Sequence, residues 1–471
     1  MLPSYRLLRE QLTQVIQNKE EQGHHVKGLA AELEALPDSY DALAAFATRL
    51  RDVPLRGGWP HVEPSDLEGI WAECDPQRPM GAMCKVDLGD AAGRVEAAFL
   101  GSVAGCVLGK PLEVRPTLVD LEEWLGELGE WPLRDYVPEG IEGVLAKQGR
   151  RPHPSWGETV RERIRYVAPD DDVNYTVLGM LLLEQHGLGL TKHHVRAAWL
   201  QQLPVLTTFG PERMLLLKAG MNTLTSPRST GGASGFGGTP PGQEEADLEE
   251  WVTLLNPRDE FCGALIRADA YGYACPGRPA LAAELAWRDA SWTHRRTGIY
   301  GAMFVAAAIA TALVARHAGL GALEVFETAL QFVPRRSRFH AIVADSLEQV
   351  RAASGWRDGY ARIHGKYAQY AHCEVYQECG TLINTLQFAR DVGDGICMQV
   401  MQGNDTDSFG ATAGSILGAY FGPGHLEERW LAPFGDDIHT ALAWFYERSL
   451  SQLAKRMGEL PARIAKQLET D

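Results

Sequence analysis

The chain has 471 residues, of which 45% are hydrophobic and 23% are charged, so it is not a disordered, collagen-like or low-complexity protein. Its 45 basic and 61 acidic residues give a formal net charge of −16, which argues against a dedicated nucleic-acid-binding protein because an acidic surface repels a phosphate backbone. The eight cysteines form no C-x-x-C pair and are too sparse for a disulfide scaffold. With charged residues throughout the first twenty positions, we expect no signal peptide, reduced thiols and a cytoplasmic protein.

Helical periodicity opens the chain. Leu8, Leu12 and Ile16 recur on one helical face, and Asp38 is placed to cap a later helix. Proline and glycine residues then interrupt the pattern before a long apolar run begins. We predict that residues 1–85 form a small helical extension, which could bind a partner protein.

The rest of the chain, residues 86–471, is predicted to be one all-α domain because alternating β-branched runs are scarce. The stretch Thr297–Ala315 carries no charge and approaches the length of a bilayer span. It consists mainly of alanine, glycine and threonine, and no second charge-free span accompanies it, so we interpret it as a buried helix and expect no membrane association. The segment Ser226–Gly242, with six glycines and three prolines, is a loop that suits either a surface linker or a lid over a substrate.

Two acidic segments each precede a helical stretch. The first is Asp170-Asp171-Asp172, and the second is Asp405-Thr406-Asp407-Ser408, followed by the predicted helix Ala411–Tyr420. Either segment alone is explained by helix capping and the helix dipole. Together they offer the carboxylate and hydroxyl oxygens that Mg²⁺ or Mn²⁺ prefers, so a two-metal site is possible if the segments meet.

These motifs resemble those of the ADP-ribosylglycohydrolases, which include the dinitrogenase-reductase-activating glycohydrolase and the ADP-ribosyl-acceptor hydrolases. The likeness runs from about Ala91 to Gly424, with the motifs in the family's order. A glycine-rich helix ends in Gly109-Lys110-Pro111-Leu112-Glu113, and the acidic segments match the family's Thr-Asp-Asp and Gly-x-Asp-Thr-Asp-Thr/Ser motifs.

The resemblance implies an orthogonal multi-helix domain with two Mg²⁺ (or Mn²⁺) ions. It assigns the metal ligands as Asp170, Asp171, Asp172, Asp405, Asp407 and Ser408. It places Glu113 near the metals and assigns Gly263, His294 and Asn404 to substrate binding. The implied reaction is hydrolysis at the anomeric carbon of a ribose, with Asp172 or Glu113 transferring the proton.

The sequence departs from the family pattern at three places. Asp170 stands for the usual threonine, Cys106 for an acid, and Phe261-Cys262-Gly263 for a Gly-Asn-Gly diphosphate loop. Three functions therefore stay open: hydrolysis of an ADP-ribosylated substrate, with nucleic acid only as a modified substrate; N-ribosyl or nucleoside hydrolysis of a small molecule; and non-catalytic, immunity-type binding.

Overall fold

The computed structural model describes residues 3–225, 243–370 and 372–470. These residues form helices and, apart from three isolated β-bridges, no β-structure, which confirms the predicted all-α class. The predicted lid or linker at Ser226–Gly242 lies outside the described residues.

The first part of the chain forms α1 to α12. Their bounds are α1 Tyr5–Glu21, α2 Leu29–Ala35, α3 Tyr40–Arg51, α4 Leu67–Glu73, α5 Leu88–Gly109, α6 Leu118–Glu127, α7 Ile141–Lys147, α8 Trp156–Thr159, α9 Asp171–His186, α10 Lys192–Gln202, α11 Gly210–Thr225 and α12 Gln243–Thr253.

The remaining helices complete the main body. They are α13 Asp269–Tyr273, α14 Pro279–Ala290, α15 Thr297–Ala312, α16 Ala315–Ala318, α17 Ala322–Leu330, α18 Arg338–Arg351, α19 Trp356–Tyr367, α20 Tyr376–Phe388, α21 Val392–Met401, α22 Thr406–Phe421, α23 Leu450–Gly458 and α24 Leu460–Leu468. Short 3₁₀ turns, among them η1 Lys110–Leu112 and η5 Cys262–Arg267, link some of them.

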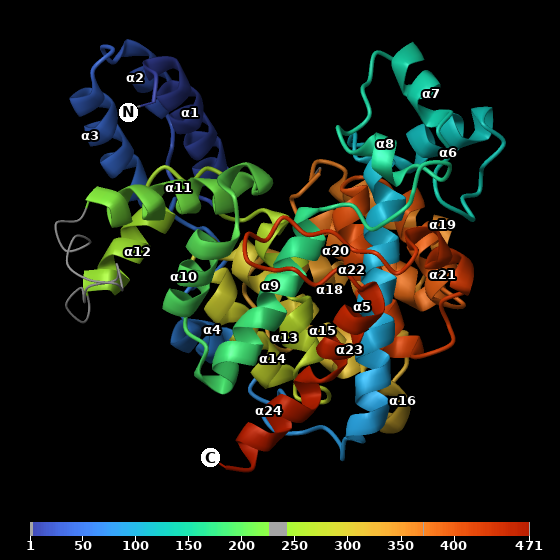
Figure 1. Ribbon diagram of the computed structural model, residues 1–471. Helices are drawn as coiled ribbons and strands as arrows, with labels where there is room; N and C mark the ends of the chain where they lie inside the picture. The colour runs from blue at the N-terminus through green and yellow to red at the C-terminus, as the bar shows by residue number, and fades with distance from the viewer. Residues whose placement is uncertain (1–2, 226–242, 371, 471) are drawn as a thin grey trace.

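Helices α5 and α22 pack side by side at the centre of the molecule (Figure 1). Glycines let their backbones touch: a Cβ atom at Gly101 would overlap the carbonyl group of Gly414, and one at Gly105 would overlap that of Gly410. Only glycine permits so close an approach. This contact fixes the end of α5 beside the start of α22, where the second acidic segment lies.

Helix α15 is buried along its whole length, as predicted for the charge-free stretch. A neighbouring helical stretch behaves similarly: in the described part of the chain, Leu88–Leu112 is long and apolar enough to cross a membrane, yet 72% of its most apolar window is buried. Length and composition alone therefore do not separate a membrane-spanning helix from a buried core helix, and both of these helices are mostly buried within the protein.

The N-terminal residues form two distinct parts. Helices α1–α3 enclose a small apolar cluster of their own, which includes Leu12 and Phe46, and they form the upper left lobe of Figure 1. Residues 61–85 instead run along the main body, where Ile70 of α4 joins its core. The cap of α3 differs from the prediction, because the hydroxyl of Ser39 accepts the capping bond while Asp38 pairs with Arg9.

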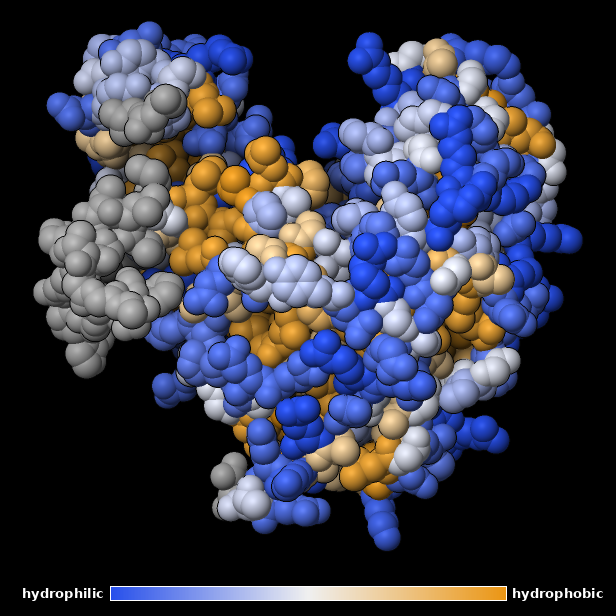
Figure 2. Space-filling model, viewed as in Figure 1, coloured by the Kyte–Doolittle hydropathy of each residue, from blue (hydrophilic) through white to orange (hydrophobic). Residues whose placement is uncertain are grey.

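The lobe of α1–α3 faces a second lobe, formed by α6–α8, across a hollow (Figures 1 and 2). The α11 side of this hollow is apolar in Figure 2, and the α6–α8 side is hydrophilic. Phe209, directly before α11, has an exposed fraction of 49%. The pocket described next takes its lining from both sides of this hollow.

Candidate active site

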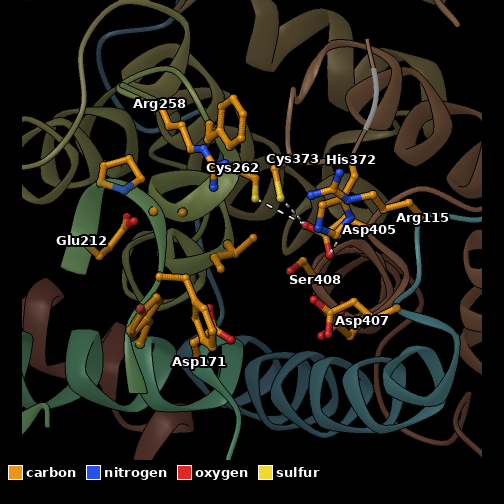
Figure 3. Close-up of a pocket in the computed structure, with 18 of the residues that line it drawn as sticks. Arg115, Asp171, Glu212, Arg258, Cys262, His372, Cys373, Asp405, Asp407 and Ser408 are labelled. Atoms are coloured by element: carbon orange, nitrogen blue, oxygen red, sulfur yellow. Dashed lines mark hydrogen bonds and ion pairs between the residues drawn. The ribbon is translucent and has the colours of Figure 1, made fainter. Parts of the chain in front are cut away.

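A pocket of about 180 Å³ opens between these two sides (Figure 3). Acidic, basic and sulfur-containing side chains from distant parts of the chain share its wall. Its charged and polar lining consists of Lys110, Glu113, Arg115, His153, Asp171, Tyr175, Glu212, Arg258, Cys262, His372, Cys373, Asp405, Asp407 and Ser408.

The two acidic segments meet at this pocket. Asp171 is the first residue of α9, and Asp407 and Ser408 belong to the first turn of α22; all three line the cavity. The hydroxyl of Ser408 lies 3.4 Å from Oδ2 of Asp172 and donates a hydrogen bond to it. The meeting of the segments, which spacing alone could not establish, is therefore a property of the fold.

The two helix starts use their aspartates differently. Asp170 caps α9, since its Oδ1 accepts from the backbone N–H of Asp172 at 3.2 Å. Asp405 occupies the same position at α22 but makes no capping bond. The capping interpretation thus accounts for Asp170 but leaves the buried carboxylate of Asp405 without that explanation.

Lys110 places a positive charge within the acidic cluster. Its Nζ lies 2.5 Å from Asp407 Oδ2, 2.7 Å from Asp170 Oδ2 and 3.0 Å from Glu113 Oε2. Burial would lower the pKa of Lys110, but the charges of Asp170 and Asp407 raise it well above its ordinary value. The ammonium group is therefore held charged and partly neutralises the cluster.

Other carboxylate oxygens in the cluster are not satisfied. Among the described residues, Asp172 Oδ1 and Asp407 Oδ1 are buried without a hydrogen-bond partner. Burial, followed by the charge of a neighbouring group, raises the pKa of Asp172 and of Asp405 well above the usual range. Free, buried oxygens of this kind have the donor chemistry that a hard cation requires.

Glu113 and Asp407 have opposite pKa shifts. Burial and then the charge of Asp407 raise the pKa of Glu113 to about 8. Burial would also raise the pKa of Asp407, but contact with the Lys110 ammonium lowers it to about 2. Of these two carboxyl groups, Asp407 is therefore the stronger acid, and Glu113 holds its proton to higher pH.

The predicted substrate-binding residues lie at different depths. Gly263 lines the pocket, and a Cβ atom there would overlap the carboxylate of Glu212. Asn404 takes a left-handed backbone with φ of 61°, and its N–H donates to Pro116. His294 is fully buried and lies behind the wall, with Nδ1 3.6 Å from Glu212 Oε1, so its side chain is not among those that face the cavity.

Glu212 is a pocket residue that the sequence did not indicate. It lies opposite Asp405 in Figure 3, and its Oε1 accepts from Arg267 Nη1 at 2.5 Å. Burial raises its pKa to about 7, although Arg267 opposes the shift. No motif surrounds Glu212, and its approach to the site depends on the contact between α11 and η5, which sequence spacing does not reveal.

Two arginines complete the rim. Arg115 and Arg258 line the pocket, and both have a positive φ, of 58° and 142°. Non-glycine residues rarely take this conformation, and it tends to occur at functional sites. The pocket therefore combines an acidic floor with guanidinium groups that can meet an anionic ligand.

A sequence model of the ADP-ribosylglycohydrolase family matches residues 88–462. The chain belongs to the ADP-ribosylglycohydrolase family. A solved structure described as an ADP-ribosylglycohydrolase-related protein complex is similar over 80% of this chain and 99% of the other, with 18% identity and a TM-score of 0.46. No curated protein sequence matches the chain.

Membership indicates a hydrolase, of the glycohydrolase type, for ADP-ribosyl-type substrates. The family is generally metal-dependent, and this member has clusters of acidic residues that could hold metal. The family match begins at residue 88, close to the position where α5 begins.

Proposed function

We propose that this ADP-ribosylglycohydrolase family member is a metal-dependent hydrolase that cleaves the glycosidic bond at the anomeric carbon of an ADP-ribosyl group. The observation that carries the proposal is the convergence of Asp171, Asp405 and Asp407 on one pocket, from helix starts that are distant in sequence. Carboxylates buried together repel one another. A protein that only binds a partner gains nothing from that electrostatic cost, so the cluster favours catalysis.

The buried oxygens without partners fit divalent cations. Asp170, Asp171, Asp172, Asp405, Asp407 and Ser408 would hold two ions, Mg²⁺ or Mn²⁺. When bound, these ions supply a grip on the vicinal hydroxyls of a ribose and orient a water molecule. A cation bound to the carboxylate oxygens of Asp170 or Asp407 would compete for them with the Lys110 ammonium group. We therefore expect these two ion pairs of Lys110 to weaken when metal binds.

The chain itself supplies proton transfer and charge stabilisation. Glu113 lines the pocket, whereas Asp172 lies behind Ser408, which favours Glu113 as the group that exchanges a proton with water or the leaving group. The surrounding carboxylates stabilise the positive charge that develops on the ribose in an oxocarbenium-like transition state.

The rim favours a phosphorylated ligand over an unphosphorylated nucleoside. Arg115, Arg258 and His153 line the pocket, and the two arginines are exposed; guanidinium groups are well suited to phosphate oxygens. They offer the substrate a diphosphate contact that does not depend on a Gly-Asn-Gly loop, which this chain lacks.

A hydrolysis assay with two substrate classes tests the proposal. Purified protein is incubated with ADP-ribosyl conjugates that differ in leaving group and, separately, with nucleosides, in Mg²⁺ or in EDTA. We expect ADP-ribose from the conjugates in Mg²⁺ only, and a loss of at least about 10²-fold in Asp405→Ala and Asp407→Ala. The matched control is Asp345→Ala, which changes a surface partner of Lys366 and should retain turnover.

The outcomes separate the alternatives. If the protein releases free ribose from nucleosides but no ADP-ribose from the conjugates, the result favours N-ribosyl hydrolysis of a small molecule. Full activity in either aspartate variant, or in EDTA, would contradict the metal-dependent mechanism.

A further inference from the structure

Two thiols enter the same pocket and point at one carboxylate (Figure 3). Cys262 Sγ lies 3.4 Å and Cys373 Sγ lies 3.3 Å from Oδ2 of Asp405. Cys262 begins η5, Cys373 belongs to the segment between α19 and α20, and Asp405 precedes α22. Three distant segments therefore bring two sulfur atoms and a carboxylate within 4.8 Å of one another.

The backbone around Cys373 is held in an unusual conformation. Cys373 has φ of 69° and Val375 has φ of 28°, a region that costs energy for residues other than glycine. The carboxylate of Glu378 fixes the arrangement, since its Oε1 accepts from the backbone N–H of Cys373 at 3.3 Å and from that of Asp405 at 3.1 Å. One buried acid thus positions both the thiol and the carboxylate that it contacts.

The distances match those of a tetrahedral thiolate site. Zinc binds sulfur at ~2.3 Å and oxygen at ~2.0 Å, so a sulfur and an oxygen on one tetrahedral ion lie ~3.5 Å apart. Both Sγ–Oδ2 distances, 3.4 Å and 3.3 Å, are close to this sulfur-to-oxygen separation. Thiolate sulfur favours Zn²⁺ and similar ions and is a poor ligand for Mg²⁺.

We propose that Cys262, Cys373 and Asp405 form a binding site for a thiophilic divalent ion, Zn²⁺, distinct in ligand chemistry from the all-oxygen cluster. The ion replaces the two thiol protons, which pass to solvent. Three protein ligands leave the fourth position open to the pocket. Because the ion engages Asp405, it removes that carboxylate from the oxygen cluster and inhibits turnover; only this consequence rests on the proposed function.

Cobalt substitution tests the site directly. Full-length protein, stripped of metal and kept reduced, is titrated with Co²⁺. We expect sulfur-to-cobalt charge-transfer bands at one equivalent, lost on addition of one equivalent of Zn²⁺. Cys262→Ser and Cys373→Ser should each weaken Co²⁺ binding by more than about tenfold. Cys373 is partly exposed, so its variant tests the site even if replacement of the buried Cys262 disturbs folding.

The control variant is Cys397→Ser. Cys397 is a buried cysteine of α21 that does not line the pocket, and its replacement should leave the cobalt spectrum unchanged. Absence of charge-transfer bands in the wild-type protein would overturn the proposal.

The two proposals fail independently. Thiolate bands without Mg²⁺-dependent turnover would support the zinc site and count against the hydrolase. Turnover in Mg²⁺ without thiolate-to-cobalt bands would support the hydrolase and count against the zinc site. If both hold, zinc should inhibit turnover in the wild-type protein, and a zinc chelator added with excess Mg²⁺ should restore it.

Discussion

At the scale of single residues, the Lys110 ammonium group is the positive charge around which the acidic cluster is arranged. The motifs located both acidic segments, because carboxylates at helix starts leave a recognisable pattern. They did not reveal that a lysine at the end of the glycine-rich helix would contact Asp170, Asp407 and Glu113. The extra acid at position 170, where the family has threonine, has this lysine as its partner.

Replacing this lysine should make folding depend on metal. In Lys110→Met, the buried carboxylates lose their ammonium partner, so we expect the free energy of unfolding in EDTA to fall by about 3–5 kcal/mol. Mg²⁺ should restore much of that loss, because a cation then neutralises the same oxygens. Chemical denaturation followed by circular dichroism, with and without Mg²⁺, measures the change.

Lys366→Met provides the comparison. Lys366 pairs with Asp345 at the surface, where it is about half exposed, so its loss should change stability by at most about 1 kcal/mol with no dependence on Mg²⁺. Equal stability of Lys110→Met and the wild-type protein in EDTA would show that Lys110 does not stabilise the cluster.

At the scale of helices, the site depends on the glycine contact between α5 and α22. The glycines of α5 belong to an apolar run in the sequence, but the sequence does not identify their partners, because backbone contact between helices leaves no local signal. The contact sets Lys110, which follows α5, against Asp407, near the start of α22. Helix packing therefore positions the charged groups.

A methyl group inserted between these helices should destabilise the protein. In Gly105→Ala, the new Cβ overlaps the carbonyl group of Gly410, and we expect a loss of at least about 2 kcal/mol in the free energy of unfolding. Gly143→Ala is the control, since Gly143 lies in α7 with no neighbour within 4 Å of the added carbon; it should gain about 0.5–1 kcal/mol from helix propensity. Urea denaturation of both variants measures the difference, and a stable Gly105→Ala variant would contradict the close packing.

At the scale of the whole molecule, the all-α fold class predicted from the sequence is confirmed, and the boundary at residues 85 and 86 stays a prediction. Periodicity and scarce strand signals sufficed for an all-α fold, since those patterns are local. The boundary at residues 85 and 86 is harder to predict because it depends on which face each segment buries. Glu63 is an ion-pair partner of Arg338, and Ile70 and Cys74 lie in the main core, although all three precede that boundary.

Two truncations should therefore behave differently. Removal of residues 1–60 takes away α1–α3 and their own apolar cluster, and we expect the remaining chain to fold. Removal of residues 1–85 also leaves Arg338 without Glu63 and opens the main core, so we expect aggregation or a molten state. Size-exclusion chromatography and thermal denaturation distinguish them. If both truncated chains fold equally well, residues 61–85 are dispensable and the extension ends at residue 85.

The internal ammonium of Lys110 bears on how the protein matures. A cluster of buried carboxylates without any cation would have to take up protons or bind an ion, whereas the Lys110 ammonium supplies part of the balancing charge from within the chain. Under the proposed function, the chain can therefore fold before it binds metal, and loading would be a separate event that depends on the ions in solution.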